Sequence, residues 1–145
     1  MADVQDAPLS DLETNFSLLK VAARGDVAAQ RALADQSVKL IGNRSDLNPI
    51  SLLNDGLIFA RMAATQGDAH DEGRVMSMLA LLGDICGELG DHDMGAVCAA
   101  EAIARLSLLA DQGVDLADQN LGKAADNASP AIMIMAKQFE RALRA

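Results

Sequence analysis

Apolar residues along this chain recur at steps of three and four, which is the spacing of one face of an α-helix. The clearest stripe is Val75, Met78, Leu79, Leu82, Ile85, Cys86 and Leu89. Weaker stripes are Leu12, Phe16, Leu19 and Ala23, then Ile50, Leu53, Leu57, Ala60 and Ala64, and finally Ile132, Met135, Phe139 and Leu143. The pattern therefore predicts helices along nearly the whole chain.

Start and stop signals divide this pattern into about seven helices. Residues 1–9 are predicted to be a flexible tail, and Ser10-Asp-Leu-Glu13 is a capping-box pattern that opens the first helix. Further boundaries are predicted at Gly25-Asp26, Asn48-Pro49, Gly67-Asp68, Gly90 to Asp93, Gly113 to Asp115 and Ser129-Pro130. The helices between them are expected at about 27–41, 49–66, 69–89, 93–112, 115–127 and 130–145.

Composition supports the helical prediction. Half of the 145 residues are hydrophobic, there are only three Phe and no Trp or Tyr, and Ala is far commoner than Val, Ile or Thr. This balance favours helix over sheet. We predict an all-α fold, an antiparallel α-hairpin stack, as a single domain over residues 10–145; the alternative is an irregular α-helical bundle.

Three helix junctions in this chain resemble one another. Gly25, Gly67 and Gly113 are separated by 42 and 46 residues. Each glycine follows an alanine by three residues and precedes an aspartate by one or two. A fixed element that returns at this spacing is typical of a helical-hairpin repeat, so about three hairpin repeats are expected.

The junction from Phe59 to Asp68 resembles the end of a Sel-one-like repeat, a relative of the tetratricopeptide repeat. The matching residues are Phe59, Ala63, Ala64, Gly67 and Asp68, and weaker matches are Phe16, Ala22, Gly25 and Asp26, then Ala110, Gly113 and Asp115. The family's usual Trp-Tyr pair and Gly-x-Gly-Val loop are not visible, and residues 36–50 fit no repeat position. The resemblance implies an adaptor or scaffold that binds a protein or peptide through a groove.

The chain is acidic, with a net charge of −9. Such a surface repels phosphate backbones, so no nucleic-acid partner is expected. No apolar run is long enough to predict a membrane span, and the acidic N-terminus lacks the pattern of a signal peptide. We therefore expect a cytoplasmic protein. Residues 130–145 differ from the rest, because they carry a net charge of +2 and leave −11 on the remainder.

This basic helix has two interpretations. It either lies on a membrane or a partner, or it closes the last hydrophobic face of a helical stack, since stacks need terminal caps. The second interpretation is preferred, and 130–145 is predicted to be a capping helix.

Few residues suggest reaction chemistry. Cys86 and Cys98 lie six residues to either side of His92, which suggests either a redox switch or two small buried hydrophobes. Together with His70 and His92, the two cysteines make four possible soft metal ligands, but they lack a metal-site spacing such as Cys-x-x-Cys. Asp91-His92-Asp93 is better explained by helix capping than by acid–base work. Asp68, Asp71 and Glu72 are predicted to cap the start of the next earlier helix in the same way. No phosphate loop or nucleophile elbow is present, so we assign no catalytic residue, cofactor or metal ligand and predict that the protein is not an enzyme.

The sequence thus predicts a non-catalytic protein-interaction module, for which a homo-oligomer is possible. The main alternative is a regulatory bundle that senses a small apolar ligand in a pocket lined by Met62, Met76, Met78, Met133 and Met135. An enzyme of unrecognised type is the weaker alternative. Gly73, Gly83 and Gly87 lie within one predicted helix, where they favour either close packing of a neighbouring helix or space for a ligand. We expect close packing.

Overall fold

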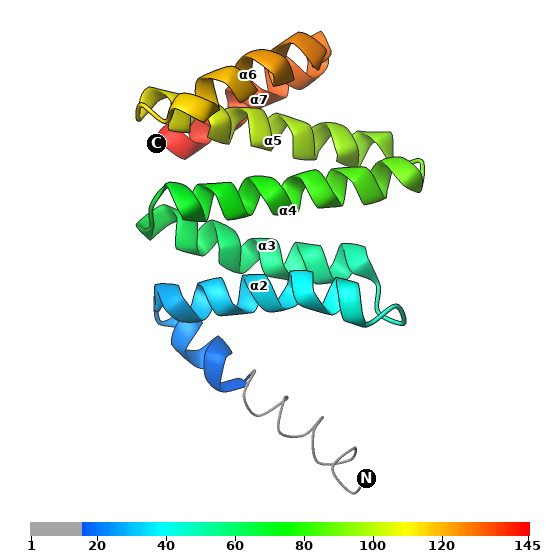
Figure 1. Cartoon of the computed structure of the whole chain (residues 1–145), viewed down its shortest axis with the longest axis vertical. Helices are drawn as coiled ribbons and strands as arrows, with labels where there is room; N and C mark the ends of the chain where they lie inside the picture. The colour runs from blue at the N-terminus through cyan, green and yellow to red at the C-terminus, as the bar shows by residue number, and fades with distance from the viewer. Residues whose placement is uncertain (1–15) are drawn as a thin grey trace, which may run out of the picture. The chain divides into compact units, whose positions relative to one another are not determined.

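The computed structural model describes residues 16–145, apart from the side chains of Leu116 and Asp118. Within this range it is helical, with no strand, so the all-α prediction is confirmed (Figure 1). Helical residues 16–23 precede α2 (Val27–Asn43), α3 (Pro49–Gln66), α4 (Ala69–Glu88), α5 (His92–Asp111), α6 (Asp115–Asn127) and α7 (Pro130–Arg144). The predicted tail 1–9 and the predicted capping box from Ser10 to Glu13 lie outside the described residues.

Side-chain caps begin α2, α3 and α7, among other helices, where the sequence predicted them. Asp26 accepts a hydrogen bond from the backbone N–H of Ala29 at 2.8 Å, ahead of α2. Asn48 caps α3, which has proline in its first turn, and Ser129 caps α7 in the same manner. Each cap satisfies an amide that the first helical turn would otherwise leave without a partner. These boundaries are therefore set by local sequence.

The three aligned glycines do not share one backbone conformation. Gly25 and Gly113 have φ of 99° and 82°, in the left-handed region that glycine tolerates best. Gly67 has φ of −95° and is extended. A Cβ added there would lie 2.6 Å from Cγ of Asp71 and 2.8 Å from the carbonyl oxygen of Ala63. Gly67 is thus needed for space and not for its backbone angle.

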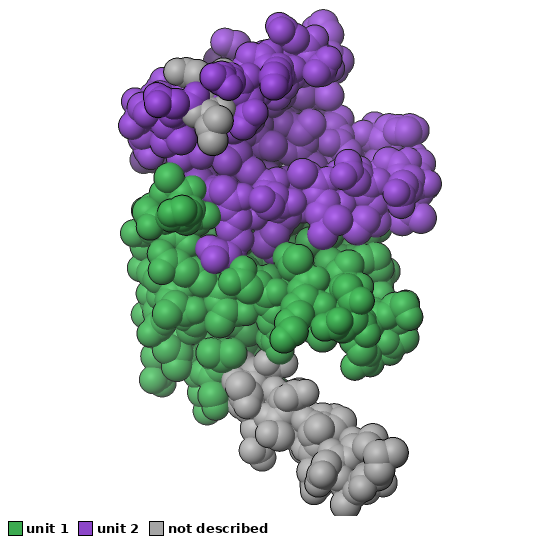
Figure 2. All heavy atoms as spheres, viewed as in Figure 1, with its two compact units in different colours: residues 1–71 green, residues 72–145 purple. Residues whose placement is uncertain are grey.

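The chain divides into two compact units, residues 1–71 (unit 1) and residues 72–145 (unit 2) (Figure 2). In unit 1, α2 packs along α3. A core cluster contains Ala22, Ala29 and Leu33, with Leu18 and Phe59 packed against it.

The core-facing side of helical residues 16–23 differs from the predicted stripe. Phe16 and Leu19 are 57% and 38% exposed, whereas Ala22 is fully buried and Leu18 packs on the core. The prediction was wrong because the buried contact is made by the small Ala22. Its carbonyl also accepts a hydrogen bond from Gln30 Nε2 of α2 at 3.0 Å.

Unit 1 ends in the first turn of α4, which carries the buried carboxylate of Asp71. Asp71 is fully buried and accepts a hydrogen bond from the N–H of Asp68 at 3.1 Å, while Asp68 accepts one from the N–H of His70 at 3.0 Å. The capping role predicted for both aspartates is confirmed. Asp71 also binds Arg31 of α2 through two hydrogen bonds of 2.7 Å. This bidentate pair raises the Arg31 pKa and ties α2 to the start of α4.

In unit 2, α5 packs against both α6 and α7. Its cluster is built on Ala100, Ile103 and Ala136, and partly buried apolar side chains of α6 and α7 pack on it, among them Leu121, Ile132, Met133, Met135 and Phe139. Arg144 near the end of α7 pairs with Asp111 and Glu140. The apolar face of α7 therefore packs within unit 2. No helix of the described residues is long and apolar enough to cross a membrane.

We predict that Gly67→Ala destabilises the protein by about 2–4 kcal/mol, because the new methyl group displaces the buried, ion-paired carboxylate of Asp71. The measurement is the free energy of unfolding from urea titration followed by circular dichroism. Gly73→Ala is the matched control within α4. An added Cβ there meets no atom of the described residues within 4 Å, so it should raise stability by up to about 1 kcal/mol. Equal effects of the two substitutions would contradict this explanation.

Candidate functional site

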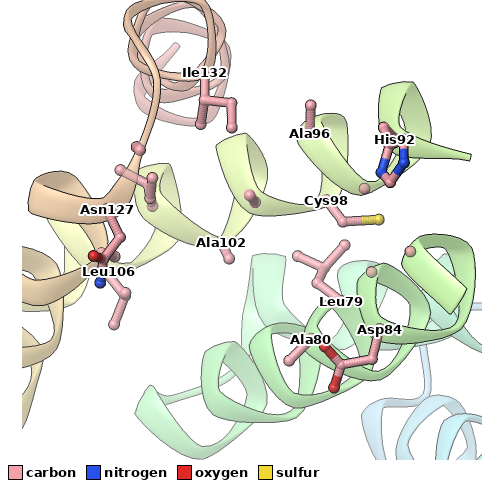
Figure 3. A pocket seen from close by; sticks show the side chains of 17 residues that line it. Leu79, Ala80, Asp84, His92, Ala96, Cys98, Ala102, Leu106, Asn127 and Ile132 are labelled. Carbon is pink, nitrogen blue, oxygen red and sulfur yellow. The ribbon is translucent and has the colours of Figure 1, made fainter. Parts of the chain in front are cut away.

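Unit 2 contains an open groove of about 550 Å³ between α4 and α5, which extends to the junction of α6 and α7 (Figure 3). We call it the α4–α5 groove. Most of its lining is apolar and small: Ala80, Gly83, Gly87, Gly95, Ala96, Ala99, Ala102, Ala124 and Ala128. Leu79, Cys98, Ile103, Leu106 and Ile132 supply the larger apolar side chains. A lining of this kind leaves room because its members scarcely extend beyond the helix backbone.

Close packing of a neighbouring helix, which we expected at the glycines of α4, is not found at Gly73 or Gly87. A Cβ added to Gly87 would meet no atom of the described residues within 4 Å. At Gly83, by contrast, α5 does approach α4, because an added Cβ would lie 3.6 Å from Cβ of Cys98, an ordinary van der Waals distance. Both glycines line the groove, so their missing side chains enlarge it. They each lower helix propensity by about 1 kcal/mol relative to Ala.

Three polar side chains line the groove, namely Asp84, His92 and Asn127, and all three are exposed. In Figure 3, Asp84 of α4 and His92 at the start of α5 lie toward one end, while Asn127 lies toward the other. Next to His92, Asp91 accepts a hydrogen bond from the N–H of Met94 at 3.1 Å. Asp91 is therefore the N-cap of α5, as predicted. His92 belongs to the groove, which its sequence context did not indicate.

The two cysteines are buried thiols, Cys86 at 1% and Cys98 at 4% exposure. Burial raises the pKa of the Cys86 thiol, and the nearby charge of Asp91 raises it further. A raised pKa keeps Cys86 protonated and weakly nucleophilic at neutral pH. This favours the interpretation of Cys86 as a small hydrophobe over a redox switch. Cys98 lines the groove.

The predicted soft ligands are spread over the length of α4. His70 lies in its first turn, whereas Cys86 is in its last turn and His92 begins α5. The sixteen residues of helix from His70 to Cys86 span about 24 Å, which separates His70 from the other candidates. Among the described residues, no three His, Cys, Asp or Glu side chains are grouped so that they could hold a metal ion.

The methionines are not placed as predicted for an apolar pocket. None of Met62, Met76, Met78, Met133 and Met135 lines the α4–α5 groove. Met78 is buried at 2% exposure, and Met133 and Met135 pack on the core of α5 and α7. Their flexible side chains fill core space, while the groove is formed where side chains are small.

A buried charge cluster connects the two helices that form the groove. Arg105 of α5 donates to Glu101 at 2.9 Å and to Glu72 of α4 at 2.8 Å. The side chain of Arg105 is 5% exposed, that of Glu101 is 6% exposed and that of Glu72 is 16% exposed. Glu72 was predicted to cap α4, but its carboxylate instead bonds Arg105. Helical periodicity could not predict this contact, because Glu72 and Arg105 are 33 positions apart.

Unit 1 has a smaller hollow of about 380 Å³, lined by the apolar residues Leu19, Leu33, Leu40, Ile58 and Phe59 and by the polar residues Gln36, Ser37 and Asp55. Ile58 is 53% exposed. This hollow is apolar as well, but it lacks the continuous small-residue lining of the α4–α5 groove.

Comparison of the chain with protein-family models, with curated proteins and with solved structures finds no match in any of the three.

We predict that Arg105→Ala destabilises the protein by about 3 kcal/mol, because it removes the cation shared by the buried carboxylate of Glu101 and the partly buried carboxylate of Glu72. Urea titration at pH 7 measures the effect. Arg44→Ala is the matched control, since Arg44 pairs with Asp46 at 2.7 Å on an exposed surface, where ion pairs contribute little. Its unfolding midpoint should be essentially that of the wild type. Similar midpoints for the two variants would show that the buried cluster is not structurally important.

Proposed function

We propose that this protein is a non-catalytic interaction module that binds an apolar helical segment of a partner protein in the α4–α5 groove. The observation that carries the proposal is the lining of the groove. Gly83, Gly87, Gly95, Ala96 and Ala99 offer backbone and methyl surface on two adjacent helices. Small residues let another helix approach closely, and the apolar side chains of that helix would then occupy the free volume.

The open form of the groove favours a protein partner over a small apolar ligand. Ala80, Asp84, Gly87 and Asn127 all line it, and all are exposed to solvent. A small-molecule site usually buries most of its ligand in a cleft or cavity. A groove with exposed sides is better suited to a segment that remains attached to a larger molecule.

The polar groups support a binding role over a catalytic one. Asp84, His92 and Asn127 are exposed and lie toward different ends of the groove. An active site needs polar groups that converge on one reacting atom in a protected cleft. The resemblance of residues 59–68 to a Sel-one-like repeat end supports the same proposal, since that family is expected to bind partners through helical grooves.

The test uses a display library of 16-residue peptides on a helical scaffold, selected on the wild-type protein. Fluorescence anisotropy then measures the affinity of enriched peptides for three proteins. Ala96→Leu fills the groove, so we expect at least about tenfold weaker binding, the equivalent of 1.4 kcal/mol. Ser77→Leu adds the same side chain to an exposed position of α4 outside the lining, and its affinity should match the wild type.

Two results would overturn the proposed function. One is a selection that enriches no peptide. The other is a set of enriched peptides that bind Ala96→Leu as tightly as the wild type, since these would bind elsewhere. Circular dichroism of both variants establishes that neither substitution has disturbed the fold.

A further inference from the structure

We infer that the segment received by the α4–α5 groove is a basic amphipathic helix, with Lys or Arg near the end that meets Asp84 and His92. This inference rests on the proposed function and specifies the chemistry of the partner. It follows from the distribution of charge around the groove and from the length of its lining.

The hairpin of α4 and α5 has an unusual charge distribution. No Lys or Arg occurs between Arg74 and Arg105, a stretch that forms most of both helices. The same stretch carries four exposed acids, Asp84, Glu88, Asp91 and Asp93. Arg105 does not offset them, because it is buried and bonded to Glu72 and Glu101.

These acids gather at one end of the groove. Asp84 lines it directly, and Glu88, Asp91 and Asp93 lie within four residues of His92, another lining residue. Toward the other end, Lys123 and Asp126 of α6 precede Asn127 and carry opposite charges. No Lys or Arg of the described residues is part of the lining. The field at the hairpin end is therefore negative.

A negative end beside an apolar surface selects the partner by charge. Lys or Arg on an incoming helix would be attracted to Asp84 and its neighbours, while Asp or Glu in the same place would be repelled. The attraction also speeds encounter and weakens as salt is added. Anionic lipid surfaces and nucleic acids are disfavoured at this site for the same reason.

The lining also sets the length of the partner helix. On α5 it runs from His92 to Leu106, which spans about 21 Å at 1.5 Å per residue. A helix of about four turns covers that distance. Its apolar and small residues would face the groove at i, i+3, i+4 and i+7 spacing, and its cations would lie at the acidic end.

The experiment measures charge dependence with one peptide scaffold. The tightest 16-residue peptide from the helical display library is synthesised in three versions that share its apolar face and carry Lys, Gln or Glu at the positions of its terminal charges. Fluorescence anisotropy with the full-length wild-type protein should rank the affinities Lys over Gln over Glu. The Lys version should bind about tenfold more tightly than the Gln version at 50 mM NaCl, with the ratio falling at 500 mM NaCl.

Matched protein variants locate the effect. Asp84→Asn should remove most of the preference for Lys. Asp55→Asn removes the same charge from an exposed position of unit 1 and should leave the preference intact. If both variants lost the preference for the Lys peptide, the preference would depend only on the net charge of the protein. That result would contradict a cation-binding position at Asp84.

Other outcomes separate this inference from the proposed function. If the Gln version binds as tightly as the Lys version and Ala96→Leu still weakens both, the groove binds helices but the basic partner is wrong. If no peptide depends on the groove, the proposed function itself fails. A dimer of the wild-type protein that Ala96→Leu dissociates would assign the groove to a second copy of this chain and overturn the inference.

Discussion

The contacts of Arg105 determine how α4 and α5 lie against each other, and the groove depends on them. Its guanidinium joins Glu72 in the first turn of α4 to Glu101 within α5. The opposite end of the hairpin is held by the turn at Gly90, where the N–H of Asp91 bonds the carbonyl of Cys86 at 2.8 Å. With both ends fixed, the small residues between them leave a space that the helices do not close. A buried ion cluster of this kind is valuable for specifying geometry even where its net contribution to stability is small.

The neighbouring carboxylates of Asp71 and Glu72, at the start of α4, form ion pairs in different units. Asp71 binds Arg31 within unit 1, and Glu72 binds Arg105 within unit 2. Gly67 leaves the space that the Asp71 carboxylate occupies. The junction from Phe59 to Asp68 is recognisable in the sequence as a turn between two helices. It is followed directly by the first helical turn of α4, which carries the ion-paired carboxylates of Asp71 and Glu72. Its importance comes from what Asp71 and Glu72 bind, and not from a reaction at the junction itself.

Local features of the fold could be predicted from the sequence, while the groove could not. Asp26, Asn48, Asp91 and Ser129 cap their helices within three residues, so sequence alone reveals them. The Arg31–Asp71 and Arg105–Glu72 contacts join residues 40 and 33 positions apart, and periodicity carries no information on such pairs. Similarly, Gly83 and Gly87 within a helix are compatible with close packing, which we expected, or with open space. Only the placement of α5 beside α4 decides between the two.

Binding of a helical segment between α4 and α5 can be observed by ¹H–¹⁵N NMR titration of the wild-type protein with a groove-selected helical peptide. Glycine amides occupy a distinct region of the spectrum, and they report on both the groove and the remaining surface. We predict that the amides of Gly83, Gly87 and Gly95, which line the groove, shift on binding. Those of Gly42, Gly73 and Gly122, which do not line it, should stay in place. Shifts confined to the second set would contradict the account, because they would place the partner away from the space between α4 and α5.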